Sequence, residues 1–413
     1  MAPAIPSGAS SARGEPRFVL AAAYRPLFLA GAVHALLFVA LWAALVESWR
    51  GARPVPIAAR CPVAWLHAHA MLFGTFPFYV FGFLGTAFPR WVGAPPPTSR
   101  RVASWLVLLG GGQTALLLGA LLAPALLVSA FALELGAFAS VLAFLAGALR
   151  RATGERRLQP VLVVFAVAIG AGALALDGAG LALPDARLHF AAVTVALHGW
   201  LLLLVGGVAQ RIVPFFTASW LGRPPAARPV SALAVWTGLG LLRVVLSLVA
   251  EAPRAVAGLD AALSVLLVYE LRAWRAGRAW REPMLAVLYV SLLWIAFALA
   301  GLAAAGLSPA HGPSFLTALR HALAIGGFAT LVLGISTRVV LGHAGRPIVA
   351  DAWILASFAS LQLAALARVV LPWLSGVMQG PDSLAHLAAL PWIAAFALWL
   401  WRMLPLLVGS PRR

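Results

Sequence analysis

Long apolar runs separated by short polar segments follow one another along almost the whole chain. A helix that crosses the apolar core of a bilayer needs about 20 apolar residues, and we find twelve runs of that kind. They cover residues 20–46, 64–88, 102–122, 126–149, 158–177, 190–214, 229–250, 255–275, 284–306, 316–341, 352–373 and 384–407. The pattern therefore predicts an all-α protein, a polytopic membrane bundle of twelve transmembrane helices.

The composition agrees with this prediction and excludes a water-soluble fold. Of the 413 residues, 62% are hydrophobic and 10% are charged, whereas soluble domains are about half apolar and a quarter charged. Residues 1–17 lack periodicity and are predicted to form a disordered cytoplasmic tail. Residues 18–413 are predicted to form a single membrane domain, because the twelve spans leave little chain for anything else.

The distribution of positive charge predicts the orientation of the chain in the membrane. The formal net charge is +18, and all 30 basic residues are arginines. Of these, 22 lie at the termini or beside the loops that follow even-numbered spans, and 6 lie on the opposite side. Because cytoplasmic loops are enriched in basic residues, both termini are predicted to be cytoplasmic. We favour this topological role over nucleic-acid binding.

Histidine is the most unusual residue inside the predicted spans. One buried His more often packs through a hydrogen bond, but a layer of them on several helices favours a metal site. The single cysteine, Cys61, excludes an intrachain disulfide and thiolate clusters. Imidazole suits haem iron and copper, so the sequence predicts haem or copper. The candidate metal ligands are His67, His69, His198, His321, His34 and His189.

The first two of these candidates are separated by one residue on the second span. Each helical residue turns about 100°, so His67 and His69 point about 200° apart, toward different neighbours. The spacing predicts two separate sites, or one ligand beside a supporting group.

A weak repeat of the same features suggests an internal three-fold organisation. His69, His198 and His321 each precede a Gly-x-Pro turn, beginning at Gly93, Gly222 and Gly345, by 24 residues. These are the second, sixth and tenth spans. The spacing is consistent with three four-helix units, each with an outer histidine and an inner glycine turn, although chance is a serious rival in so biased a sequence.

Four charged residues inside spans also need partners or functions, because a charge in hydrocarbon is costly. Arg243 and Asp260 reach similar depth on consecutive spans and are predicted to pair. Glu134 has no obvious partner and resembles a proton-carrying carboxylate. Arg368 is close enough to the outer end of its span to extend to the interface.

Several segments together resemble the NnrS family over nearly the whole chain. They are the YRPLF segment from Tyr24, the WLHAHAMLFG segment from Trp65, the RIVPFFT segment from Arg211 and the TRVVLGHAGR segment from Thr337. The resemblance implies a twelve-helix protein of the bacterial inner membrane that binds haem and copper. It also implies a role in nitric oxide handling, denitrification or protection against nitrosative stress.

Two features qualify what the resemblance implies. The family often has Glu directly after the second His of the HxH motif, whereas this chain has Ala70. The sequence also lacks an adjacent His-His pair, which argues against the chemistry of haem-copper oxidases. Consumption, transport and sensing of nitric oxide all remain open.

The inner end of the tenth span provides a second candidate constellation. Residues there could hold haem propionates or anchor the helix in the interface. The candidate cofactor-binding residues are Arg338, His343 and Arg346 at this end, together with Arg25 at the start of the first span.

A proton-coupled secondary transporter is the main alternative function. Glu134 and selected histidines would then carry protons, and Pro77 and Pro214 could break the helices around a central site. A scaffold without a cofactor is a third possibility, but it leaves the histidines unexplained. The expected partners are membrane lipid and a small gas such as nitric oxide, with no nucleic acid.

Overall fold

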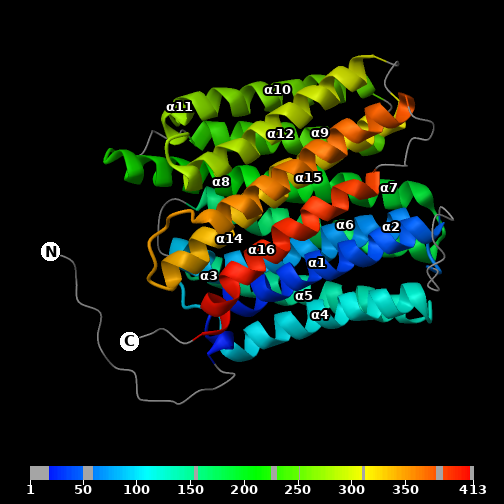
Figure 1. The fold of residues 1–413 in the computed structure, drawn as a ribbon, viewed down its shortest axis with the longest axis horizontal. Coiled ribbons are helices and arrows are strands. Elements are labelled where there is room, and N and C mark those ends of the chain that lie inside the picture. The colour runs from blue at the N-terminus through cyan, green and yellow to red at the C-terminus, as the bar shows by residue number, and fades with distance from the viewer. Residues whose placement is uncertain are drawn as a thin grey trace.

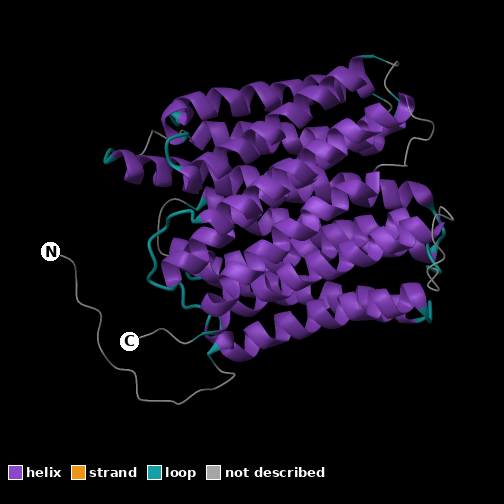
Figure 2. Ribbon diagram, in the orientation of Figure 1, coloured by secondary structure: helices purple, strands orange, loops and turns teal. Residues whose placement is uncertain are grey.

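The regular structure of the protein is helical throughout the part of the chain that can be described. The computed structural model describes residues 18–49, 59–152, 157–224, 230–250, 252–308, 312–377 and 385–409. The tail predicted for residues 1–17 lies outside this part. Within it there are helices, turns and loops but no strand (Figure 2), as the sequence predicts.

Twelve long helical segments cross the bundle, and nine of them are single α-helices. These are α1 (Tyr24–Trp49), α4 (Ser99–Leu121), α5 (Leu126–Arg150), α6 (Leu158–Ala182), α9 (Val230–Val249), α10 (Pro253–Ala273), α12 (Pro283–Leu307), α15 (Ala352–Val377) and α16 (Ala389–Val408). Short elements are η1 (Val19–Ala21), α11 (Ala276–Ala279) and η5 (Ala385–Ala388).

The other three segments are composite, because each contains a π-helical stretch between two α-helices. They are α2 (Val63–His69), η2 (Ala70–Thr75) and α3 (Phe76–Val92); α7 (Ala186–Thr194), η3 (Val195–Leu201) and α8 (Leu202–Leu221); and α13 (Pro313–His321), η4 (Ala322–Ala329) and α14 (Thr330–His343). Such π-turns are rare and are often found at functional sites.

Eleven of the segments are long and apolar enough to cross a membrane. The predicted span that is missing from these eleven is the eighth, α10, which carries Arg254, Asp260, Glu270 and Arg272 and is therefore more polar than the others. It nevertheless packs against α9 and α12 as one more helix of the bundle (Figure 1). The chain is thus a multi-pass membrane protein.

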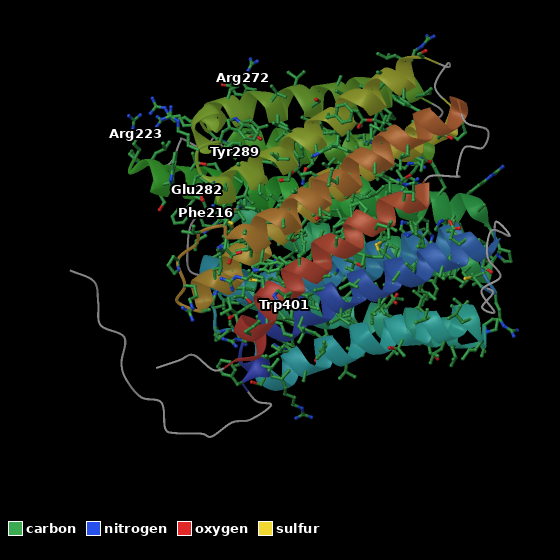
Figure 3. The ribbon with its side chains drawn as sticks, in the orientation of Figure 1. Phe216, Arg223, Arg272, Glu282, Tyr289 and Trp401 are labelled. Atoms are coloured by element: carbon green, nitrogen blue, oxygen red, sulfur yellow. The ribbon has the colours of Figure 1, made fainter. Side chains whose placement is uncertain are left out.

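The arrangement of the helix ends agrees with the topology predicted from the arginines. Figure 1 shows that α1 begins and α16 ends at the same end of the bundle. Arg223, after α8, and Arg272, in the last turn of α10, also lie at that end (Figure 3). We call it the inner end, and the opposite end the outer end.

The three composite helices form the centre of the bundle. In their most apolar stretches, 78%, 89% and 72% of the residues are buried, against 28–56% in the other eight candidate spans. The remaining helices pack around them, and α1 closes against α16 at the two ends of the chain. The second, sixth and tenth spans therefore carry the residues that are best shielded from lipid.

These three central helices share the glycine turn of the predicted repeat. Gly93, Gly222 and Gly345 have φ of 68°, 61° and 64°, and they are the positive-φ glycines of the described chain. Each ends its helix in the left-handed conformation that favours glycine. The next residue then donates to the carbonyl five positions back, at 2.9, 3.0 and 2.9 Å. One cap design thus occurs three times, four spans apart.

The inner-end loop before α15 supplies a test of local stability. Asp351 accepts a hydrogen bond from Ile354 N at 3.0 Å, which caps α15, and it also pairs with Arg402 of α16. Asp351→Ala should lower the free energy of unfolding by about 1 kcal/mol through the lost cap.

The same contacts give this loop a dependence on pH. The hydrogen bond from Arg402 holds the pKa of Asp351 below its usual 3.8. The carboxylate therefore stabilises the fold above that value, and its contribution is lost as the pH falls further. The difference between the thermal melts of wild type and Asp351→Ala should narrow as the pH falls from 7 to 3. A difference that stays constant would contradict the assignment.

Candidate functional site

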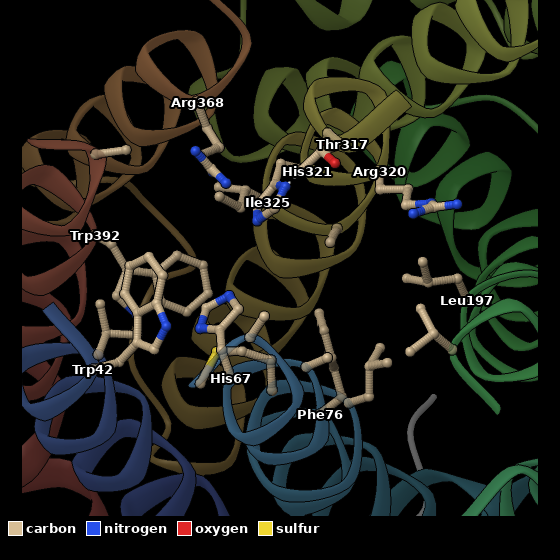
Figure 4. Close-up of a pocket in the computed structure, with 18 of the residues that line it drawn as sticks. Trp42, His67, Phe76, Leu197, Thr317, Arg320, His321, Ile325, Arg368 and Trp392 are labelled. Carbon is tan, nitrogen blue, oxygen red and sulfur yellow. Dashed lines mark hydrogen bonds between the residues drawn. The ribbon is translucent and has the colours of Figure 1, made fainter. Parts of the chain in front are cut away.

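A cavity of about 500 Å³ lies near the outer end, between the central helices (Figure 4). This volume is in the range of sites for small molecules and cofactors. Its wall comes mainly from α2 and η2, from α7, and from α13 and η4, with contributions from α1, α15 and the start of α16. Most of the lining is apolar, and its polar side chains are three histidines, two arginines and Thr317.

Two of the predicted ligands face each other across this cavity. His67 comes from α2 and His321 from the last residue of α13, and their ring centroids are 6.1 Å apart with planes inclined by 19°. His321 Nδ1 donates to the carbonyl of Thr317 at 2.8 Å. That bond places the proton on Nδ1 and leaves a lone pair on Nε2, as in histidines that bind metals.

His67 has an unsatisfied nitrogen in the same place. Its Nδ1 is buried and has no hydrogen-bond partner, and the same is true of Nε1 of Trp42, whose ring lies 4.4 Å from the imidazole. Buried polar atoms without partners are rare in proteins and usually have a functional reason. The pair of His67 and His321 is therefore the best candidate for a ligand-binding centre in this chain.

The wall of the cavity also contains a third imidazole and two guanidinium groups. His189 lines the cavity from α7, and Arg320 and Arg368 line it from α13 and α15. Arg320 lies 5.1 Å above the ring of Phe190. Arg368, which the sequence places within reach of the outer interface, lies in the cavity wall beside His321 (Figure 4).

His69 points away from the cavity and into a buried polar cluster. Its Nδ1 lies 2.6 Å from Asp177 Oδ2, and its Nε2 lies 2.9 Å from Glu134 Oε2. All three side chains are almost completely buried. Both ring nitrogens thus face carboxylates, so neither offers a lone pair to a metal in this arrangement. The prediction that His67 and His69 serve different neighbours is confirmed.

Further hydrogen bonds extend this cluster in both directions. On one side Asp177 accepts from Trp65 Nε1 at 3.2 Å and from His189 Nδ1 at 2.5 Å. On the other side Gln113 donates to Glu134 at 2.6 Å and its amide oxygen lies 2.9 Å from His34 Nε2. We call this set of seven residues the buried chain: His189, Asp177, Trp65, His69, Glu134, Gln113 and His34.

The buried chain corrects two expectations from the sequence. Glu134 was predicted to lack a partner, and it has two, His69 and Gln113. His34 was a candidate metal ligand, but its two ring nitrogens contact Gln113 and Thr75. These contacts join helices far apart in the sequence, which no spacing along the chain reveals. The carboxylates near the HxH motif come from α5 and α6, not from position 70.

The remaining sequence candidates lie elsewhere. His198 is buried in η3, and Nδ1 has no hydrogen-bond partner. It is not among the residues that line the cavity, so the three repeated histidines do not converge. The side chain of His386, which stands at the start of the last predicted span, lies outside the described residues.

The four predicted cofactor-binding residues lie at the inner end, away from the cavity. Arg25 donates to the carbonyls of Leu407 and Gly409. Arg338 pairs with Glu282 at 3.2 Å. Figure 3 shows Glu282 at this end.

The other two residues of this set belong to the same region. His343 Nδ1 donates to the carbonyl of Val339, and its ring packs against Tyr24. Arg346 is exposed after the third glycine cap. None of the four lines the cavity, so they do not fit the role of holding propionates of a haem placed there.

Two other expectations concerned charges and prolines inside the spans. Arg243 and Asp260 form a buried two-point ion pair at 2.9 and 3.3 Å, which confirms the predicted pair. Pro77 and Pro214 were candidate helix breaks. Both lie inside continuous helical segments, Val63–Val92 and Ala186–Leu221, and Pro77 is the second residue of α3. The broken helices typical of transporters are not found at these positions.

Sequence reasoning missed several residues of the site. Asp177 stands at the end of a predicted span and was treated as a boundary, and Arg320 was counted only as a loop charge. The signal in the sequence was their position. Arg320 directly precedes His321, and Asp177 lies in the helix before the one that carries His189. Among the described residues, no group of three or more His, Cys, Asp or Glu side chains is arranged to hold a metal ion. A centre in the cavity would therefore rest on a pair of imidazoles.

Comparison with known proteins bears directly on the resemblance seen in the sequence. No curated protein matches the chain. The model of the family described as NnrS protein matches residues 18–412, which includes all twelve helical segments, the cavity and the buried chain. Because the match covers nearly the whole chain, this multi-pass membrane protein belongs to the NnrS family.

Proposed function

We propose that the protein binds haem in the outer cavity and handles nitric oxide there, in the bacterial inner membrane. The observation that carries the proposal is the pair of imidazoles of His67 and His321, 6.1 Å apart across an apolar cavity. Metal–imidazole bonds are about 2 Å long, so this separation leaves room for one ion between the rings. Haem iron commonly takes histidine as its axial ligand.

The chemistry of the lining supports haem over a free ion. The cavity is far larger than an ion needs, and its wall includes Trp42, Phe76, Phe190 and Trp392, which would pack against a flat apolar ring. His321 keeps Nε2 available through its bond to Thr317. When bound, haem would supply an iron that could coordinate nitric oxide in place of one of the two imidazoles, and the protein would supply the ligands and exclude water.

The location of the cavity suits an apolar gas. Nitric oxide dissolves in lipid, so it can reach a site inside the bundle without an aqueous channel. Copper is part of the proposal through the family resemblance alone. Roles in denitrification and nitrosative stress follow from the same resemblance, and they would place the protein where nitric oxide is formed or removed.

The visible spectrum of the purified protein tests this function. Wild type should show a Soret band that shifts when nitric oxide is added. His67→Ala and His321→Ala should each reduce haem content by roughly tenfold or more, because even groups that only support a ligand change metal affinity 10- to 100-fold. His343→Ala, at the inner end, is the matched control and should keep the band. Colourless wild type from haem-supplied cells would refute the proposal.

A proton-coupled secondary transporter is the second candidate, and the buried chain favours it. Glu134 is fully buried among donors and acceptors that alternate from His189 to His34. The unbroken helices at Pro77 and Pro214 count against it. Colourless protein that moves protons with a solute in proteoliposomes, and loses this activity in Glu134→Gln, would establish the transporter instead.

A further inference from the structure

The two imidazoles that face each other across the outer cavity are held in different ways. His321 Nδ1 donates to the carbonyl of Thr317, one turn earlier on α13, at 2.8 Å. His67 Nδ1 is buried and has no hydrogen-bond partner among the described residues. Both rings line the same cavity (Figure 4), so they differ in their support and not in their access to a ligand.

The hydrogen bond to Thr317 prepares His321 for metal binding. It places the ring proton on Nδ1, holds the ring at one angle and makes Nε2 a stronger electron donor. The acceptor is a backbone carbonyl of the same helix, so the bond does not depend on a second side chain that could turn away. The imidazole of His321 is therefore oriented before any ion arrives.

The imidazole of His67 lacks this support. Its buried Nδ1 does not face the cavity, so a metal ion there would contact Nε2, and the ring proton would then lie on Nδ1. The ring of Trp42 is the neighbour at 4.4 Å, but an indole has only an N–H and cannot accept this proton. Coordination by His67 would thus leave a buried donor without an acceptor, which is unfavourable.

We propose that His321 is the permanent axial ligand of the haem and that His67 is the exchangeable one, which gives way when nitric oxide binds. The inference rests on the proposed function and adds the face of the haem on which the gas binds. Loss of a supporting hydrogen bond typically lowers metal affinity 10- to 100-fold, so the unsupported imidazole is the one that leaves. Nitric oxide then binds on the side of α2.

The first test measures how strongly each imidazole holds haem. The full-length protein from haem-limited cells is titrated with haem, and the Soret band gives the affinity. His67→Ala and His321→Ala both weaken binding under the proposed function. We expect the loss in His321→Ala to be larger by about tenfold or more, the lower end of what a supporting hydrogen bond contributes. Equal losses, or a larger loss in His67→Ala, would overturn the inference.

Further variants separate the loss of a ligand from misfolding. His67→Gln and His321→Gln retain a side chain of similar length and should reproduce the order of the alanine variants. Thr317→Val is the matched control, because it changes the cavity wall beside His321 but keeps the carbonyl that accepts the hydrogen bond. Its haem affinity should equal that of wild type. A loss as large as that of His321→Ala would contradict the role assigned to the carbonyl.

The second test identifies the imidazole that remains when nitric oxide is bound. In the EPR spectrum of ferrous haem with nitric oxide, a nitrogen ligand on the opposite face adds its own splitting. Wild type and His67→Ala should give the same spectrum, with splitting from His321, and His321→Ala should lack this splitting. The inference fails if the spectrum of wild type matches that of His321→Ala.

These outcomes are distinct from a failure of the proposed function. Wild type that binds no haem in the Soret titration would refute the function and the inference together. Wild type that binds haem and nitric oxide, but whose two imidazoles prove equivalent, would keep the function and refute only the inference.

Discussion

Asp177→Ala is expected to reduce the free energy of unfolding by about 3–5 kcal/mol, the range observed when one partner of a buried ionic group is removed. Asp177 is 1% exposed and accepts hydrogen bonds from Trp65, His69 and His189. Its loss leaves the buried Trp65 and His69 and the partly exposed His189 without an acceptor. Each unsatisfied group adds a desolvation penalty of about 1–3 kcal/mol.

Thermal unfolding of the detergent-purified protein measures this effect. Size-exclusion chromatography checks that each variant is monodisperse. Asp177→Asn keeps the size and one acceptor oxygen, so it should fall between wild type and Asp177→Ala. Asp185→Ala is the matched control, because Asp185 caps α7 through Arg187 N at the surface. That cap is worth about 1 kcal/mol. If the two alanine variants unfold at the same temperature, the buried chain does not stabilise the fold.

The periodic and local features of the structure could be predicted from the sequence. Apolar runs located all twelve helical segments, because the bilayer fixes the length that a span must have. The glycines at 93, 222 and 345 identified the repeat, since a left-handed helix cap needs glycine at one defined position. The 200° divergence of His67 and His69 also follows from helix geometry alone, and both residues lie before the π-turn that would disturb it.

Contacts between helices could not be predicted in the same way. His69 meets Glu134 and Asp177 from positions 65 and 108 residues away, and nothing local indicates which face of α5 or α6 turns toward α2. The three π-turns also rotate the chain downstream of them. Arg320 shows why such a side chain is missed. The count of arginines at the two sides of the membrane uses it only to predict topology, and that count does not show that its side chain faces a cavity.

The pair of Arg243 and Asp260 could be predicted from the sequence, because the two residues lie on consecutive spans. Breaking this pair is expected to have the second large effect on stability. Both residues are buried, at 6% and 1% exposure, and Arg243 Nε and Nη2 each donate to one carboxylate oxygen. Either Arg243→Leu or Asp260→Leu should lower the free energy of unfolding by about 3–5 kcal/mol, because the remaining charge stays buried and unpaired.

The double variant separates the pair from its individual members. Arg243→Leu with Asp260→Leu removes both charges, and apolar replacement of a buried pair is often neutral or stabilising, so most of the lost stability should return. Arg254 is an exposed arginine six residues before Asp260 on the same helix, and Arg254→Ala should change stability by no more than about 0.5 kcal/mol. The thermal midpoints of wild type, the two single variants and the double variant give the coupling energy between Arg243 and Asp260. Losses that simply add in the double variant would mean that each residue is held by other groups, and the observed two-point contact would then contribute nothing of its own.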